Sequence, residues 1–273
     1  MERMDADMPF LLRYENVAWY ENGRVRILDR RVYPAQVRFV ECTSCREVAQ
    51  AVRDMVTQSA GPYTAVGMGM ALAAYECRGR SGEEQAAFLE QASRELAGAR
   101  PTAANRYAAV TERCRRAALA ALSAGDDPVQ AAVRTTVESL NRRYERMQAV
   151  GDRLAELIPD GGTILTQCFG ETIIGTVMRA ARRQKKTFRV FCAETRPYLQ
   201  GARLTASCFA EMGFDTTVVT DNMAAYVMER EKVDLFTSAA DTIALPKVSG
   251  AFSQRLFRLG VSFLISNCFR TDE

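Results

Sequence analysis

The sequence predicts an α/β protein with a small N-terminal sheet and a helical layer, followed by a Rossmann-like domain built on a parallel, doubly wound sheet. Two observations carry this prediction. Apolar residues recur at helical spacing over roughly residues 44–157, as on the buried faces of amphipathic helices. After residues 159–162 (Pro-Asp-Gly-Gly), short apolar runs alternate with amphipathic stretches, which is typical of parallel sheets. We therefore place the N-terminal domain over residues 1–157 and the Rossmann-like domain over residues 158–273.

The first forty residues contain short strand patterns separated by turns. The runs at 17–20 and 25–28 flank Asn22-Gly23, a dipeptide favoured in tight hairpin turns. A third apolar run follows at 37–40. These features predict a small sheet.

Two sequence signals mark helix starts in the helical layer. Ser44 followed by Glu47 has the pattern of a capping box. Asp127-Pro128 combines a capping carboxylate with proline at the first helical position. We expect a long amphipathic helix after Pro128.

The second domain is expected to alternate strands and helices. The predicted strands cover residues 163–166, 188–193, 216–220, 233–238 and 262–265, and the helices between them cover 173–182, 199–212 and 223–230. In such sheets, ligands bind beyond the carboxyl ends of the strands. The polar residues that follow those ends are Gln167-Cys168, Glu194-Thr195-Arg196, Asp221-Asn222 and Asp241.

Composition limits the class of protein. The 273 residues are 48% hydrophobic and 25% charged, with a net charge of +3. There is no dense basic tract, so we do not expect a nucleic-acid partner. No uninterrupted apolar run is long enough to cross a bilayer and no signal peptide is visible, so we expect no membrane partner and a cytoplasmic location. Eight scattered cysteines then indicate reduced thiols.

The chain contains no histidine. Catalytic triads and metal sites that need imidazole are therefore excluded, and proton transfer must use other side chains. The single Cys-x-x-Cys, Cys42 to Cys45, has no second ligand pair. No dinucleotide glycine fingerprint is present in the second domain. We expect neither a metal nor a redox cofactor.

Cys168 and Asp241 are the candidates for chemistry. Cys168 lies just past the first strand of the second domain, where amides at a helix start would lower a thiol pKa. Asp241 ends the apolar run 233–240. Taken from position alone, Cys168 is more often a buried small hydrophobe and Asp241 more often a cap or loop ligand.

Residues 193–205 read Ala-Glu-Thr-Arg-Pro-Tyr-Leu-Gln-Gly-Ala-Arg-Leu-Thr, and residues 220–226 read Thr-Asp-Asn-Met-Ala-Ala-Tyr. This string resembles the signature of the methylthioribose-1-phosphate isomerases. Their fold is shared with ribose-1,5-bisphosphate isomerases and with regulatory subunits of eukaryotic translation initiation factor 2B. The chain is similar to a divergent, shortened member of a group that contains both enzymes and non-catalytic subunits.

The resemblance implies an aldose-ketose isomerase. A cysteine and an aspartate form the family's catalytic couple, and this chain keeps both, as Cys168 in 164–168 (Ile-Leu-Thr-Gln-Cys) and Asp241 in 238–241 (Ser-Ala-Ala-Asp). The initiation-factor subunits have generally lost them. The couple would supply acid and base for opening a sugar 1-phosphate ring and moving hydrogen from C2 to C1. Family members are typically dimers, so we expect a homodimer.

Four further residues match substrate-binding positions of the family. Arg100 in Arg-Pro-Thr corresponds to a phosphate ligand, and Gln200 to a substrate-binding glutamine. Lys247 aligns with a family lysine, and Asn222 keeps its local sequence and is expected to cap a helix. Without the resemblance, Arg100 would be read as an arginine in a turn between helices.

The match departs from the family at the site itself. Gln58 replaces an arginine of the family's phosphate loop, Gln167 replaces a histidine, and Glu171 adds an acidic group nearby. Losing a guanidinium weakens the case for a dianionic ligand at that loop. Three alternatives follow: an isomerase acting on a related ribose derivative, an enzyme using the same pair on a different small polar substrate, or a non-catalytic regulatory subunit.

Overall fold

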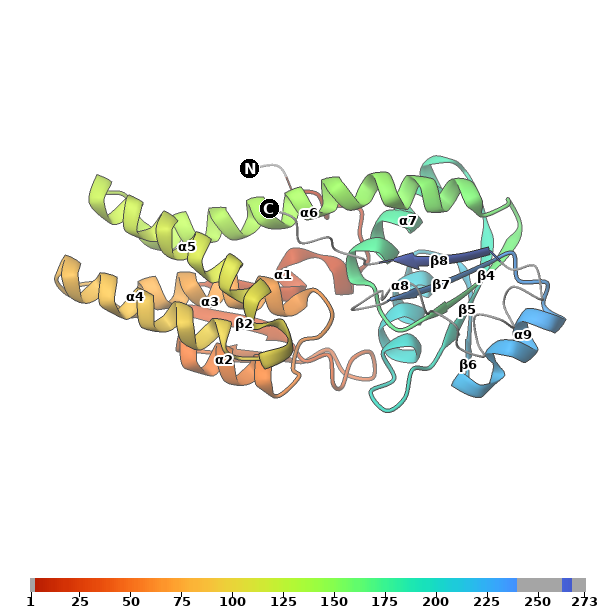
Figure 1. The fold of residues 1–273 in the computed structure, drawn as a ribbon, viewed down its shortest axis with the longest axis horizontal. Coiled ribbons are helices and arrows are strands. Elements are labelled where there is room, and N and C mark those ends of the chain that lie inside the picture. The colour runs from red at the N-terminus through yellow and green to blue at the C-terminus, as the bar shows by residue number, and fades with distance from the viewer. Residues whose placement is uncertain (1–2, 240–261, 267–273) are drawn as a thin grey trace, which may run out of the picture. The chain divides into compact units, whose positions relative to one another are not determined.

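The computed structural model describes residues 3–239 and 262–266, and the chain divides into two compact units (Figure 1). The first unit contains residues 1–6 and 11–143, and the second contains residues 7–10 and 144–273. The division falls inside helix α6 (Pro128–Leu157), whereas the sequence pattern placed it after residue 157. The end of α6 packs closely against residues 171–183 of the second unit at Gly151. A Cβ at that position would lie 2.7 Å from Thr176.

The first unit begins with two short helical turns and a small antiparallel sheet. These elements are η1 (Phe10–Leu12), α1 (Tyr14–Val17), β1 (Ala18–Glu21), β2 (Arg24–Leu28) and β3 (Phe39–Cys42), and the strand order is β1-β2-β3. The hairpin turn predicted at Asn22-Gly23 is confirmed, since both residues have positive φ, 48° and 79°. Such angles match the turn type that joins twisted antiparallel strands.

Helices fill the rest of the first unit. They are α2 (Cys45–Arg53), α3 (Gly61–Glu76), α4 (Gly82–Ala97), η2 (Pro101–Ala103), α5 (Ala104–Ala124) and the start of α6. Ser44 caps α2 by accepting from the Glu47 amide, and Asp127 caps α6 through the amides of Val129 and Gln130. Both predicted helix starts are therefore confirmed.

Helix α3 forms the centre of the first unit, because most of its residues are buried on every side. Two of its glycines allow neighbouring helices to approach. A Cβ at Gly67 would lie 2.6 Å from Thr136 of α6, and one at Gly69 would lie 3.0 Å from Leu96 of α4 and Val48 of α2. These glycines serve packing.

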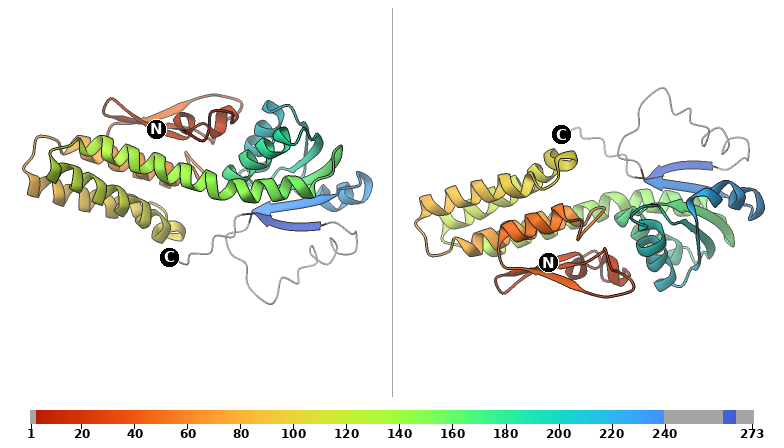
Figure 2. Two further views of the ribbon diagram at one scale, coloured as in Figure 1. Left: turned by 90° about the horizontal axis from the view of Figure 1, so that it is seen from above. Right: turned by 90° about the horizontal axis from the view of Figure 1, so that it is seen from below.

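The second unit is a parallel, doubly wound domain, which confirms the predicted fold class. The strands are β4 (Gly162–Gln167), β5 (Phe188–Ala193), β6 (Asp215–Val219), β7 (Leu235–Ala239) and β8 (Ser262–Ser266), in the order β6-β5-β4-β7-β8. The helical elements are α7 (Glu171–Arg183), a π-helical turn (Gly201–Thr205), α8 (Ala206–Glu211), η4 (Asp221–Met223) and α9 (Ala224–Arg230). Strands β7 and β8 lie side by side in both views of Figure 2.

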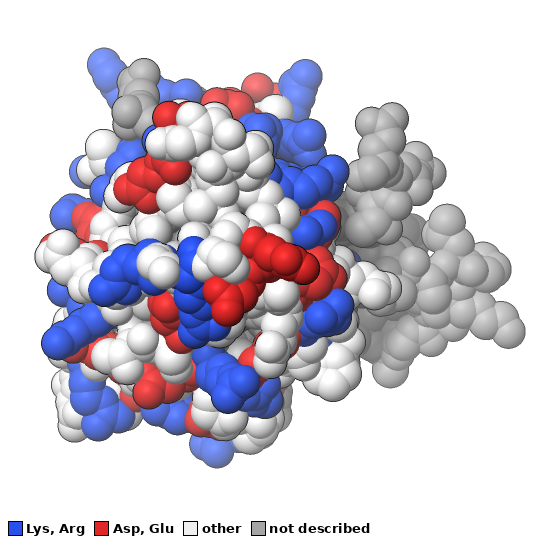
Figure 3. All heavy atoms as spheres, turned by 90° about the vertical axis from the view of Figure 1, so that its left-hand side faces the viewer, with Lys and Arg blue, Asp and Glu red and all other residues white. Residues whose placement is uncertain are grey.

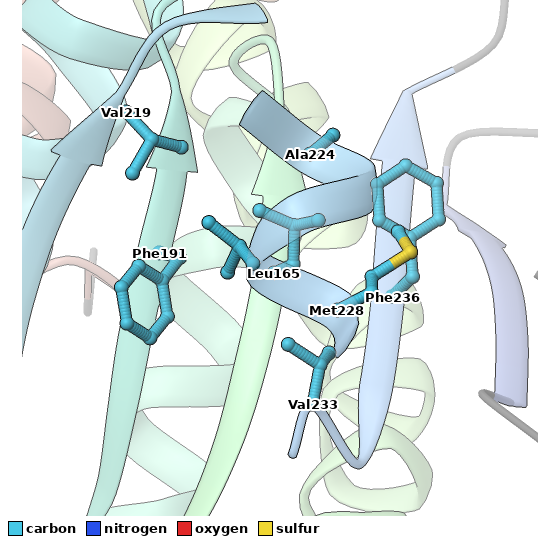
Figure 4. Close-up of a cluster of buried hydrophobic side chains, with 8 residues drawn as sticks. Leu165, Phe191, Val219, Ala224, Met228, Val233 and Phe236 are labelled. Atoms are coloured by element: carbon cyan, nitrogen blue, oxygen red, sulfur yellow. The ribbon is translucent and has the colours of Figure 1, made fainter. Parts of the chain in front are cut away.

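Both faces of this sheet are covered. On one face, α9 packs over the sheet through Ala224, Val227 and Met228, which join Leu165, Phe191 and Phe236 in a buried cluster (Figure 4). On the other face, Ile164 and Thr166 line a small space with residues of α7 and with Phe209 of α8. Alternate residues of β4 thus face opposite layers, as a buried parallel strand requires.

The surface of the first unit carries charges of both signs. On the face drawn in Figure 3, basic and acidic side chains are interspersed. Helices α4 and α5 contribute ion pairs such as Arg94 with Glu90 and Arg115 with Glu112, at 2.9 and 2.7 Å. Among the helices of residues 3–239, none combines the length and apolarity needed to cross a membrane.

Candidate active site at the carboxyl edge of the parallel sheet

The order of the strands puts a topological switch point at the carboxyl end of β4. The chain leaves β4 for β5 on one side and returns to β7 on the other. The last residue of β4, Gln167, pairs with Ala193 of β5 and with Ser238 of β7. Ligands of doubly wound folds bind at such a point. Cys168 is the next residue along the chain.

The backbone of Cys168 is held on both sides. Its N–H donates to Thr195 Oγ1 at 2.9 Å, and its carbonyl accepts from Thr205 Oγ1 at 2.5 Å. Its φ of +62° lies in the left-handed region, which non-glycine residues adopt only when their surroundings impose it. Cys168 is half-buried, whereas the other cysteines of the described chain are buried. The cysteine predicted to carry chemistry is therefore the least buried of that set.

The loop after β5 is fixed by a carboxylate from the end of β6. The amides of Thr195 and Arg196 donate to Asp221 Oδ1 and Oδ2, each at 2.8 Å. Thr195 itself has a φ of +63°. Glu194 and Arg196 form an ion pair at 2.9 Å, which is the structural alternative that the sequence left open for them.

A glycine lets the next turn approach the end of β5. A Cβ at Gly201 would lie 1.8 Å from the carbonyl oxygen of Ala193, so any other residue there would clash with the backbone. Gly201 begins the π-helical turn that replaces the start of the helix predicted at 199–212 and that carries Thr205. Such turns are rare and frequently mark functional sites. Gln200 precedes it, and its Oε1 is buried with no hydrogen-bond partner in the described part of the chain.

The expectation that Asn222 caps a helix is wrong. Asn222 lies within the 3-10 turn η4, and the position before α9 is Met223, without a side-chain cap. Its Oδ1 instead accepts from the hydroxyl of Thr220 at 2.6 Å. The local reason is the extra turn, which moves the start of the α-helix beyond the asparagine.

The remaining predicted residues divide between the first unit and the part that is not described. Asp241 and Lys247 lie outside the described residues. Arg100 lies in the first unit, where it donates through Nε to the carbonyl of Val52 at 2.9 Å and through Nη2 to that of Thr57 at 2.8 Å. Its guanidinium therefore braces the segment that leads into α3.

That segment contains Gln58, which a second guanidinium contacts from outside the segment, and sequence reasoning missed this contact. Arg30 is fully buried and donates through Nη1 to the carbonyl of Gln58 at 2.6 Å. A Cβ at Gly61 would lie 3.1 Å from the same Nη1. The loop in which the family resemblance implies an arginine at position 58 thus has a permanent positive charge beside it. Nothing in the sequence pattern around Arg30 signals this contact.

Sequence reasoning also missed the roles of Thr195, Thr205 and Asp221. Two of them appear among the polar residues that follow strand ends, so their place in the sequence was a partial signal. Thr205 gives no signal at all, because it lies inside an expected helix. Its contact with Cys168 depends on the π-helical turn.

Cys168 is half-buried, whereas the nearby cysteine on β5, Cys192, is buried. Burial raises the pKa of the Cys192 thiol, on β5, to about 12, so that thiol is neutral near pH 7. Glu171, the acidic residue noted near the site, opens α7 and is buried. Within residues 3–239 and 262–266, no cluster of three cysteine, aspartate or glutamate residues could hold a metal ion.

Comparisons with known proteins give the family. Residues 59–245 match the Initiation factor 2 subunit family. The methylthioribose-1-phosphate isomerase of Chloroflexus aurantiacus is 35% identical over 255 residues, covering 90% of this chain and 72% of the relative. That of Desulforudis audaxviator is 38% identical over 246 residues, covering 83% and 67%.

Two solved structures are similar in fold. Translation initiation factor eIF-2B subunit delta from A. fulgidus has a TM-score of 0.74 at 29% identity, covering 92% of this chain and 76% of that one. The 5-methylthioribose 1-phosphate isomerase from Pyrococcus horikoshii OT3 has a TM-score of 0.72 at 26% identity, covering 93% and 76%. The two neighbours are named for different functions, so fold alone does not decide between an enzyme and a subunit.

Proposed function

Because this chain belongs to the Initiation factor 2 subunit family, which its methylthioribose-1-phosphate isomerase relatives share, we propose that it is an aldose-ketose isomerase acting on an aldose 1-phosphate. The substrate is methylthioribose 1-phosphate or a related ribose derivative. The observation that carries the proposal is the presentation of Cys168 at the switch point, with both backbone polar groups held and the residue itself less buried than the other described cysteines.

The proposed chemistry uses Cys168 and Asp241 as acid and base. An acid protonates the ring oxygen while the bond from that oxygen to C1 breaks. Hydrogen then moves from C2 to C1, and the C2 hydroxyl loses its proton to a base as the ketone forms. C2 is oxidised and C1 is reduced within one molecule, so the balance requires no external oxidant or reductant.

The proposed substrate contacts are taken unit by unit. In the second unit, Gln200 is supported by its buried amide oxygen, which has no partner among the described residues, and Asn222 by its position after β6. Lys247 rests on the sequence resemblance alone. In the first unit, Arg100 is proposed to bind phosphate, and Arg30 supports a phosphorylated substrate because it keeps a cation beside Gln58.

Turnover of a substrate panel tests the proposal. Methylthioribose 1-phosphate, ribose 1-phosphate and their unphosphorylated analogues are incubated with the wild type, with Cys168→Ser and with Asp241→Asn, and ketose is followed by proton NMR. We expect ketose from a phosphorylated sugar, with a loss on the order of 10²–10⁴-fold in each variant. Asp215→Asn, an exposed position at the amino end of β6, is the matched control.

Two further readings complete the test. In D2O, deuterium at C1 of the product indicates a proton route through an enediolate, and its absence indicates hydride transfer. Binding of the same sugars without turnover would favour the non-catalytic subunit instead. Turnover of unphosphorylated analogues alone would move the proposal to a different polar substrate.

We also propose that the enzyme works in the cytoplasm as a homodimer, as the family resemblance implies. Light scattering coupled to gel filtration tests the second point. A mass close to twice the 30.3 kDa of one chain would support it, and a monomeric mass would overturn it.

A further inference from the structure

We propose that Asp221 and Thr195 are positioning residues for Cys168, so that the ends of β6 and β5 set the geometry of the residue that follows β4. This inference rests on the proposed function, because it takes Cys168 as the reacting thiol. It adds Thr195 and Asp221 to the proposed site, as residues whose side chains hold the loop backbone and do not contact the substrate.

The first link is the Asp221 carboxylate. Its two oxygens accept from two consecutive amides, those of Thr195 and Arg196, each at 2.8 Å. Thr195 is β-branched and has a φ of +63°, a strained conformation that persists only where the surroundings impose it. A bidentate carboxylate supplies that constraint through charge-assisted hydrogen bonds.

The second link is the Thr195 hydroxyl. It donates to the carbonyl of Ala193 at 3.1 Å and accepts from the N–H of Cys168 at 2.9 Å. A hydroxyl has one proton, so donation to Ala193 directs a lone pair towards Cys168. Serine can reproduce both bonds, whereas valine, which has the same shape as threonine, can make neither.

The third link is the conformation of Cys168 itself. With a φ of +62°, it lies in a region that an L-residue leaves when its contacts are removed. The position of its thiol relative to the start of α7 at Glu171 depends on that backbone angle. Loosening the Thr195 contact is therefore expected to change the position of the sulfur relative to the start of α7, and amides at a helix start favour a nearby thiolate.

The test uses variants that preserve shape. Thr195→Val removes the hydroxyl, Thr195→Ser keeps it, and Asp221→Asn keeps the size of an exposed side chain while removing its charge. Thr216→Val and Asp215→Asn, both on β6, carry the same substitutions away from the site. Melting temperatures establish that each variant is folded.

Two measurements read out positioning directly. The first is the pH profile of Cys168 alkylation by iodoacetamide, quantified on the peptide that contains Cys168. We expect Thr195→Val and Asp221→Asn to raise the midpoint by about one pH unit, which corresponds to roughly tenfold slower alkylation near neutral pH. Thr195→Ser should stay close to the wild type, as should both controls.

The second measurement is hydrogen exchange of the Cys168 amide by NMR. It does not depend on access to the thiol, and we expect faster exchange in Thr195→Val than in the wild type or Thr195→Ser. An unchanged exchange rate and alkylation midpoint in Thr195→Val would overturn the inference. So would equal effects of Thr195→Val and Thr216→Val.

Failure of this inference is distinguishable from failure of the proposed function. If the wild type converts no sugar phosphate but Thr195→Val shifts alkylation and exchange as expected, the isomerase proposal fails and the positioning role stands. If the wild type is an isomerase, Thr195→Val should lower kcat about tenfold with KM nearly unchanged. An isomerase with unaltered kcat in that variant would contradict the positioning role alone.

Discussion

The loops after β4 and β5 in the second unit have backbone amides fixed by side chains, whereas the loop before α3 in the first unit, like Gln200 of the second, holds buried side-chain oxygens without a hydrogen-bond partner among the described residues. In the second unit, the amides of Cys168, Thr195 and Arg196 are all hydrogen-bonded to side chains. In the loop before α3, buried side-chain oxygens of Thr57 and Gln58 have no hydrogen-bond partner within the described chain. By the family resemblance, the first region keeps Cys168 but departs at Gln167 and Glu171, and the second departs at Gln58.

The difference separates reaction chemistry from ligand recognition. A hydrogen-bonded loop holds a reacting group in one geometry, which is what a chemical step requires. A buried polar group without a partner costs about 1–3 kcal/mol, and it is tolerated where water or a ligand completes it. We therefore expect the chemistry of the family to be retained in the second unit, and substrate preference to differ through the first.

The largest effect should come from closing the space at Gly201. In Gly201→Ala, the new methyl group would meet the backbone carbonyl of Ala193 at 1.8 Å. Backbone cannot rotate away, so we expect a loss of about 3 kcal/mol or more in the free energy of unfolding, and loss of turnover. Urea denaturation measures the first quantity.

Gly61→Ala is the matched change in the other loop. Its methyl group would meet the Thr57 hydroxyl at 2.0 Å, but a side chain can change rotamer, so we expect a cost nearer 1 kcal/mol. Equal costs at the two glycines would contradict the view that the second-unit loop is the more tightly constrained.

Cysteine reactivity should differ sharply between the core and the site. Burial raises the pKa values of Cys42, Cys45 and Cys192 to about 12, so only about one in ten thousand of those thiols is ionised at pH 8. We expect iodoacetamide at pH 8 to modify Cys168 at least a hundredfold faster. Peptide mass spectrometry of the native protein measures each rate, and comparable modification of Cys192 would show that Cys168 has no special exposure.

Much of the fold was predictable, because periodicity reports burial directly. Strand β5 was predicted at residues 188–193, where it lies, since a run of apolar residues between turn signals has few alternatives. The position of Cys168 directly after β4 was also predicted from sequence. Thr205 and Arg30 were not, because their contacts depend on a π-helical turn and on a long-range approach to Gln58 that no local pattern encodes.

The stability of the first unit should fall in acid as Asp29, whose network reaches the loop before α3, becomes protonated. Asp29 is buried and accepts hydrogen bonds from Arg31 and Arg38. The bond from Arg31, and to a smaller extent that from Arg38, holds the pKa of this carboxyl at about 2, below its ordinary 3.8. The depressed pKa means that this stabilisation is complete above pH 3.8 and is lost as the pH falls towards 2. The neighbouring Arg30 amide donates to Val56 at 2.8 Å, which ties this network to the loop.

Asp29→Asn should therefore cost about 1–2 kcal/mol at pH 7, a value reduced by the solvent exposure of both arginines. The difference from the wild type should shrink between pH 4 and pH 2. Urea denaturation at several pH values measures it. A difference that persists unchanged at pH 2 would show that the carboxylate charge is not its source.

The smallest expected effect is the most informative about the substrate. The Thr57 side chain is fully buried, and its hydroxyl has no hydrogen-bond partner in the described chain. Thr57→Val replaces it with a methyl group of the same shape, so stability should be unchanged or should rise by up to about 1 kcal/mol. If a ligand forms a hydrogen bond with the Thr57 hydroxyl, the same variant should raise KM severalfold and leave kcat nearly unchanged. The reason is that the lost interaction is common to the ground and transition states. Thr135→Val, at a half-buried hydroxyl that donates to the Ala131 carbonyl within α6, is the control. A stabilised Thr57→Val with an unaltered KM would show that this hydroxyl lies in the core without contacting the ligand. The residues that alter substrate preference would then have to be sought in the second unit.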